Sequence, residues 1–123
     1  MWVYSFLGVM LFSCLFVSAQ NVPAAEISQA TKDCLECHNL ASPGIVADWK
    51  KSRHYQVSPA EAVKKPVNER RVSVTKPPDN LAGFAVGCAE CHANNPGGHP
   101  DSFEHGDLKV HVVVTPKDCQ VCH

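Results

Sequence analysis

Three short motifs, each of the form C-x-x-C-H, contain the residues of this chain that can do chemistry. Two thiols at this spacing can form thioether bonds to the two vinyl groups of one porphyrin, and the adjacent imidazole then reaches the iron from the same side. The pattern therefore predicts three sites of haem c attachment. The expected attachment residues are Cys34, Cys37, Cys88, Cys91, Cys119 and Cys122, and the expected iron ligands are His38, His92 and His123.

A C-x-x-C pair alone is a weaker signal, because it also occurs in zinc sites and in thioredoxin-like redox centres. Here a histidine follows every pair directly. Neither zinc binding nor disulfide pairing explains that regularity. A zinc-binding protein is therefore the least favoured alternative.

The sixth ligand of each iron must come from elsewhere in the chain. Both methionines, Met1 and Met10, lie in an apolar leader, so a processed chain offers only histidine, water or nothing. Four histidines remain for three irons, and His99 ranks last because it lies in a loose turn. A lone histidine is usually a surface or hydrogen-bonded imidazole, but the demand for ligands reverses that expectation here. The expected distal ligands are, in order, His54, His105 and His111.

Composition limits the chain to one small domain. It has 123 residues, 7 Cys, 7 His and 9 Pro, a formal net charge of −1 and only 7% aromatic residues. Beyond the leader, large apolar side chains are few, so a conventional core would be marginal and porphyrin would supply the missing apolar volume. The near-neutral charge argues against a nucleic-acid partner, because phosphate binding calls for a basic face.

The N-terminal stretch reads as a signal peptide over residues 1–19. Residues 3–17 are apolar but short for a membrane span, and small residues precede a cleavage point after Ala19. No Lys or Arg precedes the apolar run, which leaves two alternatives: an uncleaved membrane anchor, or a lipoprotein acylated at Cys14. Haem c is attached outside the cytoplasmic membrane in bacteria. We therefore expect an exported, periplasmic protein, associated with the membrane only if the leader is uncleaved.

The remaining residues predict short helices joined by irregular segments. Thr31 is expected to cap the turn that carries the first motif, and an amphipathic helix over 45–54 to deliver His54 at its end. Residues 67–83 are expected to be irregular, and residues 110–114 to form a short strand. Capping boxes are expected at Ser58–Glu61 and Thr115–Asp118.

Three further side chains have simple structural interpretations. Trp49 shares a helical phase with Ile45 and is expected to pack against porphyrin. Glu36 and Glu90 occupy the same inner position of two motifs, and solvation is the simplest expectation for both.

The first motif and the residues after it resemble a known family. Cys34-Leu35-Glu36-Cys37-His38, followed by Pro43, Val46, Trp49-Lys50, Ser52 and His54, is similar to the N-terminal part of hydroxylamine oxidoreductase-like octahaem cytochromes c. The Val86-Gly87-Cys88 and Val114-Thr115-Pro116 entries to the later motifs are similar too, so the resemblance covers residues from about 31 to 123. It implies a mostly α fold with long irregular haem-ligating loops and little conventional core, with His54 as a distal ligand.

The resemblance also implies how the chain would work. In that family the first three haems form a wire to a later catalytic haem, where hydroxylamine is oxidised or nitrite reduced. Five of the eight family motifs, including that of the catalytic haem, are absent here, so no catalytic residue is expected in this chain. The leading hypothesis makes residues 20–123 the trihaem, electron-transferring N-terminal portion of a longer enzyme, partnered by the rest of that enzyme and by redox proteins. The competing hypothesis is a self-contained periplasmic trihaem carrier.

Overall fold

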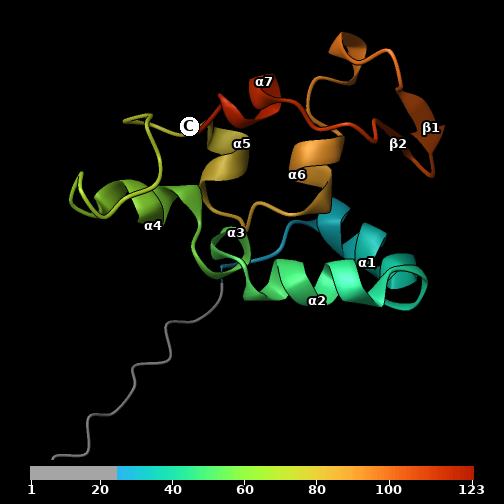
Figure 1. Ribbon diagram of the computed structural model, residues 1–123, viewed down its shortest axis with the longest axis horizontal. Coiled ribbons are helices and arrows are strands. Elements are labelled where there is room, and N and C mark those ends of the chain that lie inside the picture. Colours follow the sequence, from blue (N-terminus) through green and yellow to red (C-terminus); the bar gives the residue numbers. More distant parts are fainter. Residues whose placement is uncertain (1–24) are drawn as a thin grey trace, which may run out of the picture.

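The computed structural model describes residues 25–123 as a set of short helices with one small hairpin (Figure 1). The elements are α1 (Gln29–Ala41), α2 (Pro43–Lys51), α3 (Arg53–Gln56), α4 (Pro59–Lys64), α5 (Asp79–Ala82), α6 (Cys88–His92), the 3-10 turn η1 (Pro96–Gly98), β1 (Phe103–His105), β2 (Leu108–Val110) and α7 (Pro116–Cys119). The predicted mostly helical class is confirmed. The signal peptide, the cleavage point and Cys14 lie outside the described residues.

Helix α1 begins earlier than predicted, and Thr31 does not cap it. Ser28 is the N-cap, and its hydroxyl accepts a hydrogen bond from the Thr31 backbone N–H at 3.1 Å. Thr31 is fully buried and faces α6, where its Oγ1 accepts from the Ala89 N–H at 3.1 Å. The prediction was wrong because a better-placed serine lies three residues upstream.

The helix predicted over 45–54 is two helices. Helix α2 packs on α1 and ends at Lys51, and Ser52 then adopts an extended conformation with ψ of 160°. The Ser52 hydroxyl accepts from the Tyr55 N–H at 3.3 Å, which starts the short helix α3. This break turns the chain, so His54 projects from α3 rather than from the end of α2.

Ser58 caps α4 as predicted, since its hydroxyl accepts from the Glu61 N–H at 3.3 Å and α4 begins at Pro59. The second half of the predicted capping box is not formed, because the Glu61 carboxylate accepts from Lys64 Nζ at 2.5 Å instead.

The connection from 65 to 78 has neither helix nor strand, as predicted, but the end of the segment predicted to be irregular over 67–83 was wrong, because residues 79–82 form α5. Its Ser73 and Val74 N–H groups donate to the Cys122 carbonyl at 2.9 and 3.3 Å. The irregular connection is therefore fastened to the third motif.

A two-stranded antiparallel hairpin follows the second motif. Gly106 takes a φ of +59° in its turn, a conformation that glycine adopts without steric cost. The strand predicted over 110–114 contains only Val110 of that range, because β2 ends there. The N–H groups of Val112 and Val113 donate instead to the Asp101 carboxylate at 2.9 and 2.8 Å.

The apolar core of the described residues is small, as the composition predicts. The buried apolar residues are Leu35, Val46, Leu81, Ala85, Ala89 and Cys122. Large apolar side chains such as Leu40, Ile45 and Val112 are more than half exposed. Within residues 25–123, no helix has the length and apolarity that a membrane span requires.

Candidate haem-binding site

Each of the three motifs lies on or beside a helix, but each uses its helix differently. The first is inside α1, the second makes up all of α6, and the third begins at the last residue of α7. None of the six cysteines described is in a disulfide. Their thiols are therefore free for another covalent bond.

Every motif histidine faces one of the three predicted distal histidines. The ring centres lie 6.2 Å apart in the pair His38–His105, 6.1 Å in His92–His111 and 6.0 Å in His54–His123. A metal–nitrogen bond of about 2 Å puts each imidazole centre roughly 3 Å from a shared metal, so two opposite ligands have centres roughly 6 Å apart. All three pairs fit one iron held between two imidazoles.

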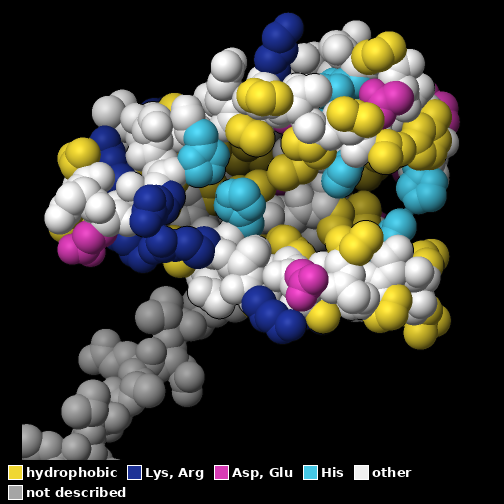
Figure 2. Space-filling view, viewed as in Figure 1, with side chains coloured by type: hydrophobic (Ala, Val, Ile, Leu, Met, Phe, Trp, Pro, Cys, Tyr) yellow, Lys and Arg dark blue, Asp and Glu magenta, His cyan; other side chains and the backbone are white. Residues whose placement is uncertain are grey.

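Two cavities lie between these pairs. One, of about 190 Å³, is lined by His54, His123 and Cys122, and the other, of about 390 Å³, by the two remaining histidine pairs with Cys34 and Cys88. Figure 2 shows histidine side chains around a hollow that hydrophobic side chains line. Cys88 lines the larger cavity and Cys91 the smaller, so the second motif separates the two. The lining suits flat, apolar cofactors placed close together.

The pair His92–His111 is connected by its own backbone. His92 Nδ1 lies 2.8 Å from the His111 carbonyl oxygen, and the His111 N–H donates to the His92 carbonyl at 2.9 Å. If Nδ1 of His92 donates to that carbonyl, Nε2 is the nitrogen with a free lone pair. The backbone of one ligand thus sets the tautomer of the other.

His111 supplies the clearest sign that a group belongs between the rings. Its side chain is buried, and neither ring nitrogen has a hydrogen-bond partner among the described residues. An unsatisfied buried polar group costs about 1–3 kcal/mol. A bond from one ring nitrogen to a metal would remove that cost.

The pair His54–His123 joins α3 to the third motif. The His54 carbonyl accepts from the Val86 N–H at 3.0 Å, which fixes α3 against the segment leading to the second motif. Partial burial, followed by the neighbouring His123, lowers the pKa of His54. An imidazole whose pKa is lowered from its usual value is neutral at physiological pH, and the neutral form is the one that binds metals.

In the part of the chain that the structure describes, no cysteine belongs to a group of three converging metal-ligand side chains. Burial raises the pKa of Cys34, Cys88 and Cys122, and raises that of Cys91 to about 11 with a further contribution from nearby Cys119. Zinc needs several thiolates or imidazoles converging on one point. Among the described residues, the group of three ligand-type side chains that converges is His99, His111 and Asp118, which contains no cysteine.

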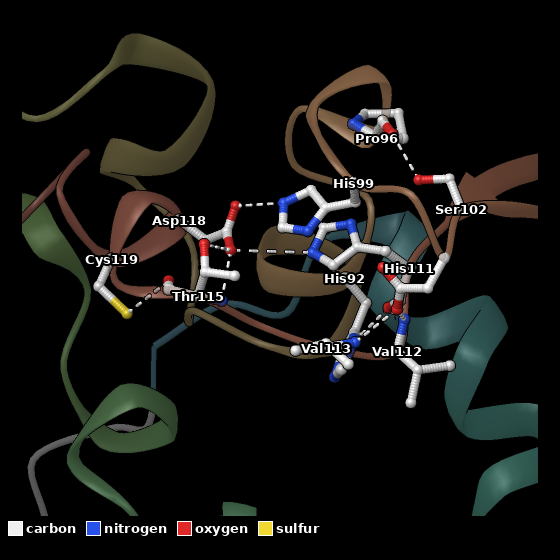
Figure 3. A network of polar contacts seen from close by, with 11 residues as sticks. His92, Pro96, His99, Ser102, His111, Val112, Val113, Thr115, Asp118 and Cys119 are labelled. Atoms are coloured by element: carbon white, nitrogen blue, oxygen red, sulfur yellow. Dashed lines mark hydrogen bonds and ion pairs between the residues drawn. The ribbon is translucent and has the colours of Figure 1, made fainter.

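Two features of the site were missed from the sequence, and the first is a buried contact of His99. This histidine does not face a motif histidine. Its Nε2 lies 2.9 Å from Asp118 Oδ1, and its ring stacks on His111 with centres 3.5 Å apart (Figure 3). The predicted capping role of Asp118 is present, since its carboxylate accepts from the Thr115 N–H at 2.7 Å, but sequence spacing does not indicate its contact with His99.

The second missed feature is Glu90, which is not solvated as expected. Its carboxylate accepts hydrogen bonds from the Ser28 hydroxyl at 2.5 Å, the Thr31 hydroxyl at 2.7 Å and the Gly87 N–H at 2.9 Å. It thereby joins the start of α1 to the start of α6. Its place three residues after the N-cap Gly87 is the spacing of a capping box, a signal that would have identified it. Glu36 is exposed, as predicted.

Comparisons with known proteins agree with these observations. A solved structure described as a hypothetical multiheme protein matches with a TM-score of 0.77 and 51% identity, over 81% of this chain and 20% of that one. The predicted resemblance is confirmed. A probable nitrite reductase-hydroxylamine oxidoreductase fusion protein of Kuenenia stuttgartiensis is 27% identical over 93 residues, which are 73% of this chain and 10% of that protein. No protein-family model matches the chain.

This chain therefore resembles hydroxylamine oxidoreductase-like multihaem cytochromes. It spans a tenth of the length of the curated relative and a fifth of the solved one. The likeness to the solved structure, in both fold and sequence, is strong over the part it covers. The activities of the longer proteins lie outside that comparison.

Proposed function

We propose that this chain carries three covalently attached c-type haems and transfers electrons between them. The observation that carries the proposal is the set of three histidine pairs, each joining one C-x-x-C-H motif to one distal histidine at 6.0–6.2 Å. In all three pairs the distance between ring centres matches the distance between two imidazoles on opposite sides of one iron, which supports a haem in each pair.

In each motif the two cysteines would attach the haem and the histidine would bind its iron. The two thiols would add across the two vinyl groups, each forming one S–C bond while its proton ends on the other vinyl carbon. The motif histidine and its partner would hold the iron from opposite sides. When bound, each haem supplies one reversible Fe(III)/Fe(II) electron. With two histidine ligands and no methionine, low reduction potentials are expected.

The three haems could serve a longer enzyme, and this is the second part of the proposed function. The curated relative is named as a nitrite reductase-hydroxylamine oxidoreductase fusion. We propose that the three haems conduct electrons to or from the remainder of a longer hydroxylamine-oxidising or nitrite-reducing enzyme, and to its redox partners. Haem c attachment supports an exported, periplasmic location. A haem-stained gel of the native source would test this part, because a haem-positive band near the 13.4 kDa of this polypeptide would favour the self-contained carrier.

The haem count is tested by intact mass. The full chain, expressed with a c-haem maturation system, should exceed its polypeptide mass by three haems. A mass consistent with bound zinc, or with no haem, would refute the proposal.

The ligand pairing is tested by replacing His54. His54→Ala should leave three covalent haems, convert one from low to high spin, and recover the low-spin spectrum when imidazole is added. Gln56→Ala is the matched control, because Gln56 lies on the same helix α3 and its side chain faces the Lys51 carbonyl rather than a motif histidine. Three low-spin haems in His54→Ala would show that His54 is not a ligand.

A further inference from the structure

Outside the three histidine pairs, the described residues contain one buried group of polar side chains next to an expected iron ligand. His99 Nε2 lies 2.9 Å from Asp118 Oδ1, and Asp118 Oδ2 lies 4.0 Å from His111 Nε2 (Figure 3). The side chains of His99, Asp118 and His111 are 5%, 2% and 0% exposed. Water is therefore excluded from all three.

The carboxylate of Asp118 accepts hydrogen bonds from the Thr115 N–H at 2.7 Å and the Thr115 hydroxyl at 2.9 Å, and His99 Nε2 lies 2.9 Å from its other oxygen. Hydrogen bonds of this kind favour the charged form of a carboxyl group. A full negative charge at physiological pH consequently lies beside the His111 ring. In a buried site with a low effective dielectric constant, that charge acts more strongly than it would in water.

The arrangement does not suit a separate metal ion. The rings of His99 and His111 are parallel within 1°, with centres 3.5 Å apart. The nitrogen lone pairs of two parallel rings lie in two parallel planes, whereas ligands of one ion must converge on it. Stacking instead fixes the plane of the His111 ring, and the contact with His99 fixes the carboxylate.

We propose that His99 and Asp118 are positioning residues that orient His111 and lower the reduction potential of the haem held between His92 and His111. The inference rests on the proposed function. At 4.0 Å no hydrogen bond joins the Asp118 carboxylate to His111, so its effect on the haem is electrostatic. Fe(III) has one more positive charge than Fe(II), so a fixed anion nearby favours the oxidised iron.

Asp118 also lines the smaller cavity, which His123 lines as well, together with one other acidic residue, Glu90, and three basic residues. Those residues are Arg53, Lys65 and Arg71. Their positive charges oppose the effect of the carboxylate on the third haem. The largest effect is thus expected at the His92–His111 haem, and His99, which does not line that cavity, should affect the His92–His111 haem alone.

The test is a spectroelectrochemical titration of the haem-loaded full chain, with electron paramagnetic resonance to distinguish the haems. Asp118→Asn keeps the shape and an acceptor for the Thr115 N–H but removes the charge. It should raise the potential of one haem by at least 59 mV, which is a tenfold change in its Fe(III)/Fe(II) ratio. His99→Phe keeps the stacked ring but loses the contact with Asp118, and should shift the same haem in the same direction by less.

Asp79→Asn is the matched control. It removes the same charge, but the Asp79 side chain is 86% exposed and pairs with Lys76 at the surface, so its replacement should leave all three potentials unchanged. Unchanged potentials in Asp118→Asn, or equal shifts of all three haems, would overturn the proposal. So would a transition metal in excess of haem iron that Asp118→Asn removes.

Two further outcomes are separable. If Asp118→Asn does not accumulate, the shift in His99→Phe decides the question with the same readout. Fewer than three haems in the unmodified chain would contradict the proposed function itself, because the haem count does not depend on the potentials.

Discussion

Replacing Glu90 should destabilise this protein, because the Glu90 side chain joins the start of α1 to the start of α6. Three donors converge on the Glu90 carboxylate: the hydroxyls of Ser28 and Thr31 and the N–H of Gly87. Hydrogen bonds to a charged group contribute about 1.5–3 kcal/mol each. The site is only partly buried, and water can replace some of the loss in Glu90→Ala, so we expect a cost of about 3 kcal/mol rather than the full sum.

The measurement is urea unfolding of the haem-loaded protein, followed by far-ultraviolet circular dichroism. Since small domains have about 5–15 kcal/mol of stability, a loss of this size should move the midpoint clearly without changing the slope. The unfolding midpoint of Glu90→Gln should fall between those of the unmodified protein and Glu90→Ala, because an amide oxygen still accepts hydrogen bonds but has no charge.

Glu36 is the matched control for this experiment. It holds the same inner position in the first motif, yet its side chain is exposed and none of the hydrogen bonds found in residues 25–123 involves it. Glu36→Ala should therefore change the free energy of unfolding by less than about 0.5 kcal/mol. Equal effects of the two substitutions, or a cost below about 1 kcal/mol for Glu90→Ala, would refute the assigned role of Glu90.

Two other predictions concern the same packing and the hairpin. Gly87→Ala should cost about 1–3 kcal/mol in urea unfolding, because the new methyl would lie 2.6 Å from the Thr31 methyl, whereas Gly44→Ala, which meets nothing within 4 Å, should not destabilise. Backbone hydrogen bonds, first that from Val113, lower the pKa of Asp101, so its stabilising effect is complete above about pH 4 and is lost as pH falls through its folded-state pKa. Asp101→Asn should remove that part of the acid dependence, and an unchanged acid-unfolding curve would contradict the role of this carboxylate.

The sequence predicts the chemistry of this chain better than its arrangement. Three repeats of C-x-x-C-H identify the expected haem sites because the covalent chemistry needs residues that are adjacent in the chain. The mostly helical class, the N-cap at Ser58 and the capping box at Thr115 are likewise local signals, and all three are present. Haem count, attachment and ligation remain predictions.

What the sequence does not predict depends on contacts between distant segments. Nothing in the local pattern pairs His54 with the third motif or His105 with the first, because those pairs form only when α3 and the hairpin are folded back. Thr31 was assigned as a cap because it fits the local pattern, whereas its actual partners lie on α6. Glu90 was assigned to solvent for the same reason.

The contacts that hold the described residues together are largely made by the motif residues and their partners. The carbonyls of Cys122, His54 and His92 accept backbone hydrogen bonds from the connection after α4, from the segment before α6 and from the end of the hairpin. Each of these bonds closes a long loop, and with so few buried apolar residues little else offsets the entropy of that closure. Haem attached between the histidines would hold the same segments at the same points. Folding and haem ligation thus depend on one set of contacts, and a loss of haem should loosen the connection, the hairpin and α3 together rather than one site at a time.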